Sequence, residues 1–297
     1  MRIVLIGKNG QLGWELQRTL PVLGEVIALG RNDLDLSAPD SIQNTMIKLR
    51  PDLIINAAAY TEVDLAEAQP DLAMSVNAVA PGLLAEVTRK LGAVFIHFST
   101  DYVFDGRARI PYTENDPPNP LNTYGRSKLI GEENVQQAGN AHLILRTSWV
   151  YSLRGNSFVN KVLSWSRKNR TLRIVSDQVS SPTWARALAE ITCLAIRNNP
   201  LGDFRDRRGI YNLTAAGFTS RYEWAKQILA CDPKRSEQLI QAIEPASSAE
   251  FPTPAIRPLF SALDCTKFRD TFHLALPGWE ASLQIAMAMA ALNPANR

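Results

Sequence analysis

Over its first 150 residues the chain alternates short apolar runs with longer stretches of helical periodicity, and this alternation restricts the fold more than any other feature. The apolar runs are bounded by polar or turn residues, as in strands that are buried on both faces. They lie at residues 3–6, 26–29, 53–55, 94–98 and 143–145, and helices are expected at residues 11–20, 39–49, 72–91 and 124–137. The alternation predicts an α/β fold, Rossmann-like, with a doubly wound parallel sheet.

The second half is less regular and predicts a smaller α+β part. Short strands are expected at residues 172–175 and 209–213, helices at 158–168, 183–198, 220–229 and 279–292, and an irregular proline-rich segment at 244–258. We therefore expect a dinucleotide-binding domain over residues 1–150, completed by later segments. Residues 151–297 are expected to form mainly a substrate domain.

Composition excludes several classes of protein. Of the 297 residues, 45% are hydrophobic and 21% charged, which is typical of a globular chain. The net charge of +3 is spread without a block of like charges, so neither nucleic acid nor a membrane surface is an expected partner. No apolar run reaches the length of a membrane span, and no secretion signal is recognisable at Met1, so a cytoplasmic location is expected. The three cysteines predict neither a disulfide framework nor a zinc site.

Gly7, Gly10 and Gly13 follow the first apolar run and open the first expected helix. Glycines at such a turn let backbone N–H groups approach a pyrophosphate at a helix N-terminus. The spacing GxxGxxG differs from the commoner GxGxxG, and a tight turn without a ligand is the alternative. The position of the loop between a strand and an amphipathic helix favours nucleotide binding.

Arg31 indicates which dinucleotide is preferred. The second apolar run ends in Leu29-Gly30-Arg31, and no carboxylate follows before Asp33. A carboxylate at this point accepts hydrogen bonds from a ribose 2′-OH, whereas arginine favours a 2′-phosphate. The sequence therefore predicts NADPH, with NADH also accepted; the alternative is that Arg31 is only a surface cation.

Tyr124 and Lys128 lie four residues apart at the start of an expected helix, hence on one face. A cation beside a phenol favours the phenolate and makes the pair usable as an acid or base. By itself this spacing would be better explained by a solvated helix face, because it occurs by chance in many helices. Ser99 and Thr100, however, end a neighbouring strand, where open α/β sheets place their ligands. A hydroxyl there can bind a substrate carbonyl, while His97 in the same strand is interpreted as structural.

These motifs occur together in an order that resembles the extended short-chain dehydrogenase/reductase family: the glycine loop, Asn56-Ala57-Ala58, Ser99-Thr100 and Tyr124-x-x-x-Lys128. The segments STDYVFDG at 99–106 and RTSWVY at 146–151, with Arg257-Pro258, are similar to the dTDP-4-dehydrorhamnose reductases along nearly the whole chain. The resemblance implies reduction of the C4 ketone of a dTDP-6-deoxy-4-ketohexose to dTDP-L-rhamnose, a precursor of surface polysaccharides.

The resemblance implies that Tyr124 donates the proton, Lys128 lowers its pKa and binds the nicotinamide ribose, and Thr100 binds the carbonyl oxygen. The expected cofactor contacts, from the loop and the resemblance together, are Gly7, Gly10, Gln11, Leu12, Gly13, Arg31, Asp35, Leu36, Ala58, Ala59, Tyr60, Thr61, Tyr124 and Lys128. The expected contacts to the dTDP-sugar are Val63, Thr100, Asp101, Tyr124, Trp149 and Arg257. Arg257 would clamp the diphosphate, or else form a structural ion pair.

The sequence departs from the family pattern at three points. Gly30 stands where some members carry an aspartate, which weakens any preference for NADH. Some relatives are magnesium-assisted dimers, and Glu15 would supply one ligand, but residues 286–292 contain no carboxylate, so no metal is predicted. Phe98 stands where a tyrosine occurs in other members, so its contact is expected to be apolar. A homodimer and a monomer would carry similar helices, which leaves the oligomeric state open.

Of three alternative functions, the first lacks a residue that it requires and the other two remain. A sugar-nucleotide dehydratase needs a further carboxylate after Thr100-Asp101, where this chain has Tyr102. Another sugar-nucleotide ketoreductase or an epimerase needs only the residues already named. A regulatory subunit that binds NADP without catalysis would not need Tyr124 and Lys128, which this chain retains.

Overall fold

The computed structural model describes residues 1–139 and 141–292. Within these residues the main sheet has six strands in the order β10-β5-β4-β3-β1-β2. Their bounds are β1 (Arg2–Ile6), β2 (Glu25–Leu29), β3 (Leu53–Asn56), β4 (Val94–Thr100), β5 (Ala141–Thr147) and β10 (Gly209–Asn212). Each neighbouring pair is parallel. The predicted parallel sheet is confirmed, but residues 209–212, which we expected in the smaller part, form its edge strand.

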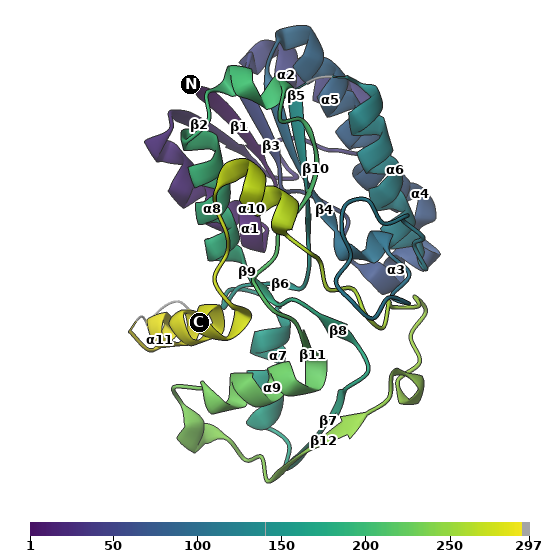
Figure 1. Cartoon of the computed structure of the whole chain (residues 1–297), viewed down its shortest axis with the longest axis vertical. Coiled ribbons are helices and arrows are strands. Elements are labelled where there is room, and N and C mark those ends of the chain that lie inside the picture. The colour runs from purple at the N-terminus through teal and green to yellow at the C-terminus, as the bar shows by residue number, and fades with distance from the viewer. Residues whose placement is uncertain (140, 293–297) are drawn as a thin grey trace.

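Helices cover both faces of this sheet (Figure 1). One face carries α2 (Pro39–Leu49), α5 (Ala80–Leu91) and α6 (Thr123–Gln137); the other carries α1 (Gln11–Thr19), α8 (Ala185–Arg197) and α10 (Thr266–Phe272). Side chains alternate across a strand, so Ile3 and Leu5 join the core under α1 and α8, whereas Val4 joins the core under α2 and α5. Burial on both faces explains why the strands are continuously apolar.

The helix expected at residues 72–91 is longer and irregular. It consists of α4 (Pro70–Met74), a π-helical turn at Ser75–Val79 and α5, preceded by the short α3 (Val63–Ala68). A π turn inserts extra backbone into a helix, a distortion that is common near functional sites. Here it contributes Asn77, which is 1% exposed.

The rest of the chain builds a second lobe around the buried rings of Tyr151 and Trp224. Its helices are α7 (Phe158–Ser166), α9 (Arg221–Ala230) and α11 (Trp279–Leu292), and its paired strands are β6 (Val150–Tyr151) with β9 (Thr183–Trp184), β7 (Thr171–Val175) with β12 (Ala242–Ala246), and β8 (Val179–Ser180) with β11 (Thr219–Ser220). Short 3₁₀ turns occur at Leu20–Val22, Asp101–Val103, Leu201–Arg205, Arg235–Glu237 and Ser248–Glu250. The segment 244–258 was expected to be irregular, but its first residues belong to β12. Because β12 is an edge strand of a two-stranded sheet, it tolerates Pro245, which has no backbone N–H to donate.

The two lobes are not consecutive in sequence. After entering the second lobe at β6, the chain returns to the main sheet with α8, β10 and α10 before it ends in α11 (Figure 1). Within residues 1–139 and 141–292, no helix has both the length and the apolar character needed to cross a bilayer.

Candidate active site

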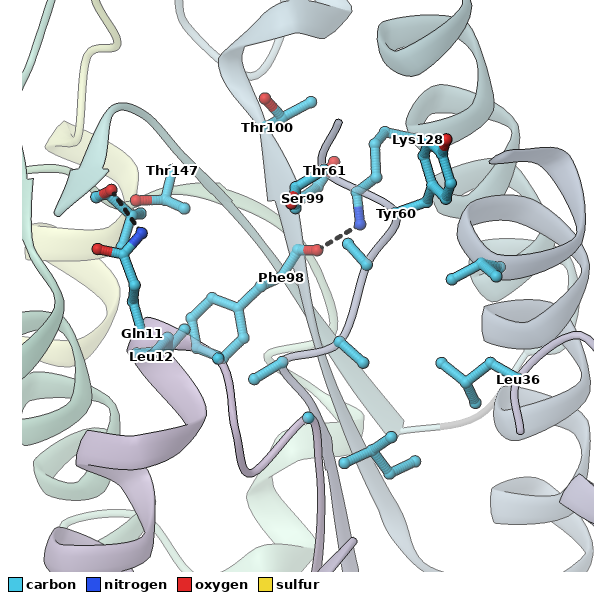
Figure 2. A pocket seen from close by; sticks show the side chains of 18 of the residues that line it. Gln11, Leu12, Leu36, Tyr60, Thr61, Phe98, Ser99, Thr100, Lys128 and Thr147 are labelled. Carbon is cyan, nitrogen blue, oxygen red and sulfur yellow. Dashed lines mark hydrogen bonds between the residues drawn. The ribbon is translucent and has the colours of Figure 1, made fainter. Parts of the chain in front are cut away.

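A cavity of about 610 Å³ opens at the carboxyl ends of β1 to β5, where the order of the strands reverses between β1 and β3. This is where ligands bind in open α/β sheets. Figure 2 shows Gln11 and Leu12 on one side of the cavity, Tyr60 and Lys128 on the other, and Phe98 to Thr100 between them. The cavity therefore joins the glycine loop to the Tyr124 helix.

Two glycines of the loop have different structural roles. Gly7 has a φ of +94°, and a Cβ on it would lie 2.7 Å from the Ala58 backbone nitrogen. Gly7 and Gly10 line the cavity, whereas Gly13 does not. A Cβ on Gly13 would lie 2.0 Å from the Gly7 carbonyl oxygen, so Gly13 allows α1 to pack against the turn. The result is a cradle of exposed backbone at the N-terminus of α1, which suits an anionic phosphate.

At the far end of the cavity lie Arg31, Asp35 and Leu36. The nearby Asp33 carboxylate is already engaged, because it pairs with Lys8 at 2.7 Å and accepts a hydrogen bond from the Gly30 N–H at 2.8 Å. Hydrogen bonds from Ser37 lower the pKa of Asp35. Arg31 is exposed and lines the same end of the cavity.

The loop after β3 brings Ala58, Ala59, Tyr60 and Thr61 into the cavity wall. Asn77 of the π turn holds it: its Oδ1 accepts from the Tyr60 N–H at 2.8 Å, and its Nδ2 donates to the Tyr60 carbonyl at 3.0 Å. The same Nδ2 donates to Ser127 Oγ on α6 at 3.0 Å. Asn77 was not among the residues expected at the site, since its only signal in the sequence is one amide within a mostly apolar helical stretch.

Tyr124 and Lys128 lie on the first turns of α6, which begins where the Asn122 side chain accepts a hydrogen bond from the Gly125 N–H. Lys128 is buried and donates to the Phe98 carbonyl at 2.7 Å (Figure 2). Burial lowers its pKa to about 8, while the Glu132 charge opposes that shift. Burial raises the pKa of Tyr124 above its usual value, against a hydrogen bond with Thr100. Tyr124 is therefore a protonated phenol at neutral pH and can act as an acid.

Asp101 lies behind Thr100 and is 2% exposed. Its Oδ1 accepts from the Thr100 hydroxyl at 3.2 Å, and its Oδ2 accepts from Ser180 at 3.1 Å and from Ser261. The two serines belong to the second lobe, so this carboxylate ties both lobes together beside the cavity. Burial raises its pKa to about 6, although all three hydroxyls favour the ionised form.

Replacing Asp101 by Asn is expected to change how stability depends on pH. The folded protein keeps the Asp101 proton up to about pH 6, whereas the unfolded chain releases it near the ordinary value of 3.8. The wild type therefore loses stability as the pH rises through this interval. The unfolding free energy of Asp101→Asn minus that of the wild type should increase by about 2 kcal/mol from about pH 4 to about pH 6. Urea unfolding at a series of pH values measures this; a constant difference would contradict it.

A second cavity of about 1190 Å³ lies against the second lobe. Arg221 and Arg257 both line it, and the Arg221 guanidinium lies 4.0 Å from the ring centroid of Trp149, which lines the first cavity. Trp149 has a φ of +40°, unusual for a bulky side chain, and stacks on Trp224. Arg257 forms an ion pair with Asp64 at 2.7 Å. Two guanidinium groups thus lie where the cavities approach each other.

Most residues expected at the site line the first cavity, but three do not. Gly13 supports the turn, Val63 begins α3 outside the lining, and Arg257 lies on the second cavity. Further lining residues that the expected contacts did not include are Ile6, Asn9, Gly30, Leu34, Ala57, Leu72, Val76, Phe98, Ser99, Thr147, Ser148 and Val150. Most of these residues are apolar or adjoin the motifs. They carry no sequence signal of their own, and they reach the cavity because they lie near the ends of the strands.

Glu15, the candidate metal ligand, lies among cations. Burial raises its pKa, while Arg186, Arg18 and Arg154 act in the opposite direction. In the part of the chain that the structure describes, no three His, Cys, Asp or Glu side chains are grouped so as to hold a metal ion. Guanidinium groups around a carboxylate do not favour a divalent cation, and we assign no step to a metal.

Known proteins are similar to this chain over nearly its whole length. Residues 1–291 match the family model of the RmlD substrate binding domain. The dTDP-4-dehydrorhamnose reductase of Salmonella typhimurium is 42% identical over 294 residues, covering 96% of each chain. That of Burkholderia thailandensis is 40% identical over 294 residues, covering 97% of this chain and 98% of the relative.

Solved structures extend the agreement to three dimensions. The crystal structure of dTDP-4-dehydrorhamnose reductase from Bacillus anthracis in complex with NADP has a TM-score of 0.89 to this chain and is 32% identical. The match covers 97% of this chain and 99% of the other. The resemblance inferred from the motifs and the Rossmann-type fold are both confirmed. Because the likeness extends over nearly the whole of both chains, this chain belongs to the dTDP-4-dehydrorhamnose reductase family.

Proposed function

We propose that this chain is an NADPH-dependent reductase that converts the C4 ketone of dTDP-4-dehydro-6-deoxy-L-mannose into dTDP-L-rhamnose. The observation that carries the proposal is one cavity lined both by a glycine cradle for phosphate and by Tyr124 and the buried Lys128, one turn apart on α6. Family relatives that are named as reductases of this ketosugar support the substrate.

The described residues suit a nicotinamide dinucleotide. Its pyrophosphate would lie on the backbone of Gly10, Gln11 and Leu12, and its adenosine beside Asp35 and Leu36. Ala58 to Thr61 would form the opposite wall, held by Asn77. When bound, the cofactor supplies the hydride that reduces the ketone.

Tyr124 would give its proton to the carbonyl oxygen as negative charge develops there, while the Thr100 hydroxyl orients that oxygen. An ammonium at Lys128 would then stabilise the phenolate. Asp101, bonded to Thr100 and to both serines of the second lobe, would keep this hydroxyl in place. Tyr124, Lys128, Thr100 and Asp101 all line the same cavity.

The remainder of the substrate would extend into the second cavity. Arg221 and Arg257 would bind the diphosphate, since guanidinium groups pair well with phosphate oxygens. Trp149, between the two cavities, would pack against the sugar. Arg257 would exchange its pairing with Asp64 for the diphosphate, which unites both roles considered for it.

Replacing Arg31 by Ala is expected to weaken NADPH binding by about tenfold and NADH binding much less, because the guanidinium would pair only with the 2′-phosphate. Asp33 is occupied by Lys8 and Gly30, so it would not compensate. Fluorescence titration with each cofactor measures both dissociation constants. Equal weakening of both would remove Arg31 from the 2′-phosphate site.

The activity itself is tested by following NADPH oxidation at 340 nm. The substrate is dTDP-glucose converted in place by a 4,6-dehydratase and a 3,5-epimerase. Oxidation that requires both enzymes and yields dTDP-L-rhamnose is the expected result. Oxidation without the epimerase would identify a different 4-ketosugar, and binding of NADPH without consumption would favour a regulatory subunit.

A further inference from the structure

Four polar groups form a buried row beneath the cavity. The Ala58 N–H donates to Asn56 Oδ1 at 3.1 Å, and Asn56 Nδ2 lies 3.2 Å from His97 Nδ1. His97 Nε2 lies 3.2 Å from Lys128 Nζ, which also donates to the Phe98 carbonyl. Asn56 and His97 are 0% exposed and Lys128 is 1% exposed. The protein itself must therefore satisfy every donor and acceptor in this row.

The backbone end of the row fixes the direction of each hydrogen bond. A backbone N–H can only donate, so the Asn56 oxygen must face Ala58 and its NH₂ group must face His97. Nδ1 of His97 then has to accept. A neutral imidazole that accepts at one nitrogen donates at the other, so His97 Nε2–H points at Lys128 Nζ.

An ammonium is only a donor and would leave two donors facing each other at this contact. A neutral amine satisfies both of its neighbours: its lone pair accepts from His97 Nε2–H, and one of its N–H bonds donates to Phe98. We propose that His97 is a positioning residue that holds Lys128 as an uncharged, hydrogen-bond-accepting amine when the site holds no cofactor.

The electrostatic surroundings of Lys128 act in both directions. His97 faces Lys128 from β4, and Tyr124 and Glu132 share α6 with it. Glu132 favours the ammonium, but its carboxylate is paired with Arg146 at 2.6 Å. Burial acts in the opposite direction and lowers the pKa of Lys128 to about 8, which by itself still favours the ammonium at pH 7, so the contact with His97 must hold the neutral amine. Burial also keeps His97 neutral by lowering the pKa of the ring well below its usual value.

The inference deepens the proposed function, and its mechanistic part rests on it. A reductase needs the ammonium when Tyr124 becomes a phenolate. Lys128 would then take one proton from solvent, and Lys–NH₂ would become Lys–NH₃⁺. The ammonium has no lone pair, so the hydrogen bond from His97 Nε2–H to Lys128 would be lost. The His97 network would thus delay the charge on Lys128 until cofactor and substrate create an acceptor for it.

The experiment is a long-range nitrogen–proton spectrum of the cofactor-free protein labelled with ¹⁵N-histidine. The chain has three histidines, so His142→Gln and His273→Gln suffice to assign the signals. We expect the spectrum to show His97 as the neutral Nε2–H tautomer at every pH near neutrality at which the protein is folded. The Nδ1–H tautomer in the wild type would overturn the proposal, with no variant needed.

Asn56→Asp provides a reversal test. A carboxylate accepts from Ala58 and from His97 alike, so Nδ1 should become the protonated nitrogen and Nε2 should accept from a Lys128 ammonium. The two ring nitrogens should exchange their chemical-shift positions. Asn134→Asp is the matched control, because it adds the same charge where the amide donates to the Ala78 carbonyl, and its His97 signals should not change. Unchanged signals in a folded Asn56→Asp would contradict the inference. Both spectra are recorded without cofactor or ketosugar, so they are independent of whether the chain reduces that sugar.

Discussion

Replacing Tyr124 by Phe is expected to lower kcat by about 10² to 10⁴-fold while leaving the dissociation constant of NADPH nearly unchanged. The variant removes the proton donor but keeps the ring, which packs edge-to-face against Tyr102 with centroids 5.8 Å apart. Because burial raises the pKa of this phenol, the wild type should remain an acid through the neutral range. Steady-state oxidation of NADPH and a binding titration separate the two quantities.

The control for this variant is Tyr222→Phe, which removes a phenol that donates to the Ile243 carbonyl in the second lobe. It should retain nearly the wild-type kcat. If Tyr124→Phe also retained kcat, another group would be the acid. A parallel loss in both variants would instead indicate damage to the fold.

Glu132→Gln is expected to lower the free energy of unfolding by about 3–5 kcal/mol, the largest stability effect that we predict. Glu132 and Arg146 form an ion pair whose side chains are only 1% and 2% exposed, with the Arg146 Nε and Nη2 both donating to the carboxylate. Removing the charge leaves a buried guanidinium without its counter-ion. Within the described part of the chain, its Nη1 already has no hydrogen-bond partner.

Urea unfolding measures the effect, and the adjacent Glu133→Gln, at an exposed position, is the matched control. A second arm combines Glu132→Gln with Arg146→Met. Because the double variant removes both charges, it should recover most of the lost stability. A loss from Glu132→Gln no larger than that from Glu133→Gln would contradict the importance of the pair.

The main sheet could be predicted because local and global signals agree in it. The central strands β3 and β4 are buried on both faces, so their apolar runs are visible without knowledge of their neighbours. The edge strand β10 was assigned to the wrong part because Gly209–Asn212 is half-buried at its start and lies far from β5 in sequence. Nothing local indicates which sheet such a short segment joins.

The site could be predicted where a motif carries its residues, as for Gly10, Thr100, Tyr124 and Lys128. Residues that act through tertiary contacts could not. Nothing in the sequence distinguishes Arg221 from the other arginines, and only the position of α9 places its guanidinium over the Trp149 ring. His97 has no partner in sequence, and its interpretation as merely structural changes only when β4 and α6 bring its ring to Lys128. Strand alternation identifies buried positions, but not which buried polar groups meet.

The return of the chain to its first sheet has a consequence for biosynthesis. The sheet face that carries Ile3, Leu5 and Ile96 is completed by apolar side chains from α8, β10 and α10. A nascent chain that has emerged only as far as β5 exposes much of this face, with α1 as its cover. The lobe that contains the main sheet therefore cannot complete its core during translation until α10 has been synthesised. Until then the open face exposes apolar side chains to solvent, and chains terminated near residue 150 are expected to be degraded rather than to accumulate as a free nucleotide-binding domain.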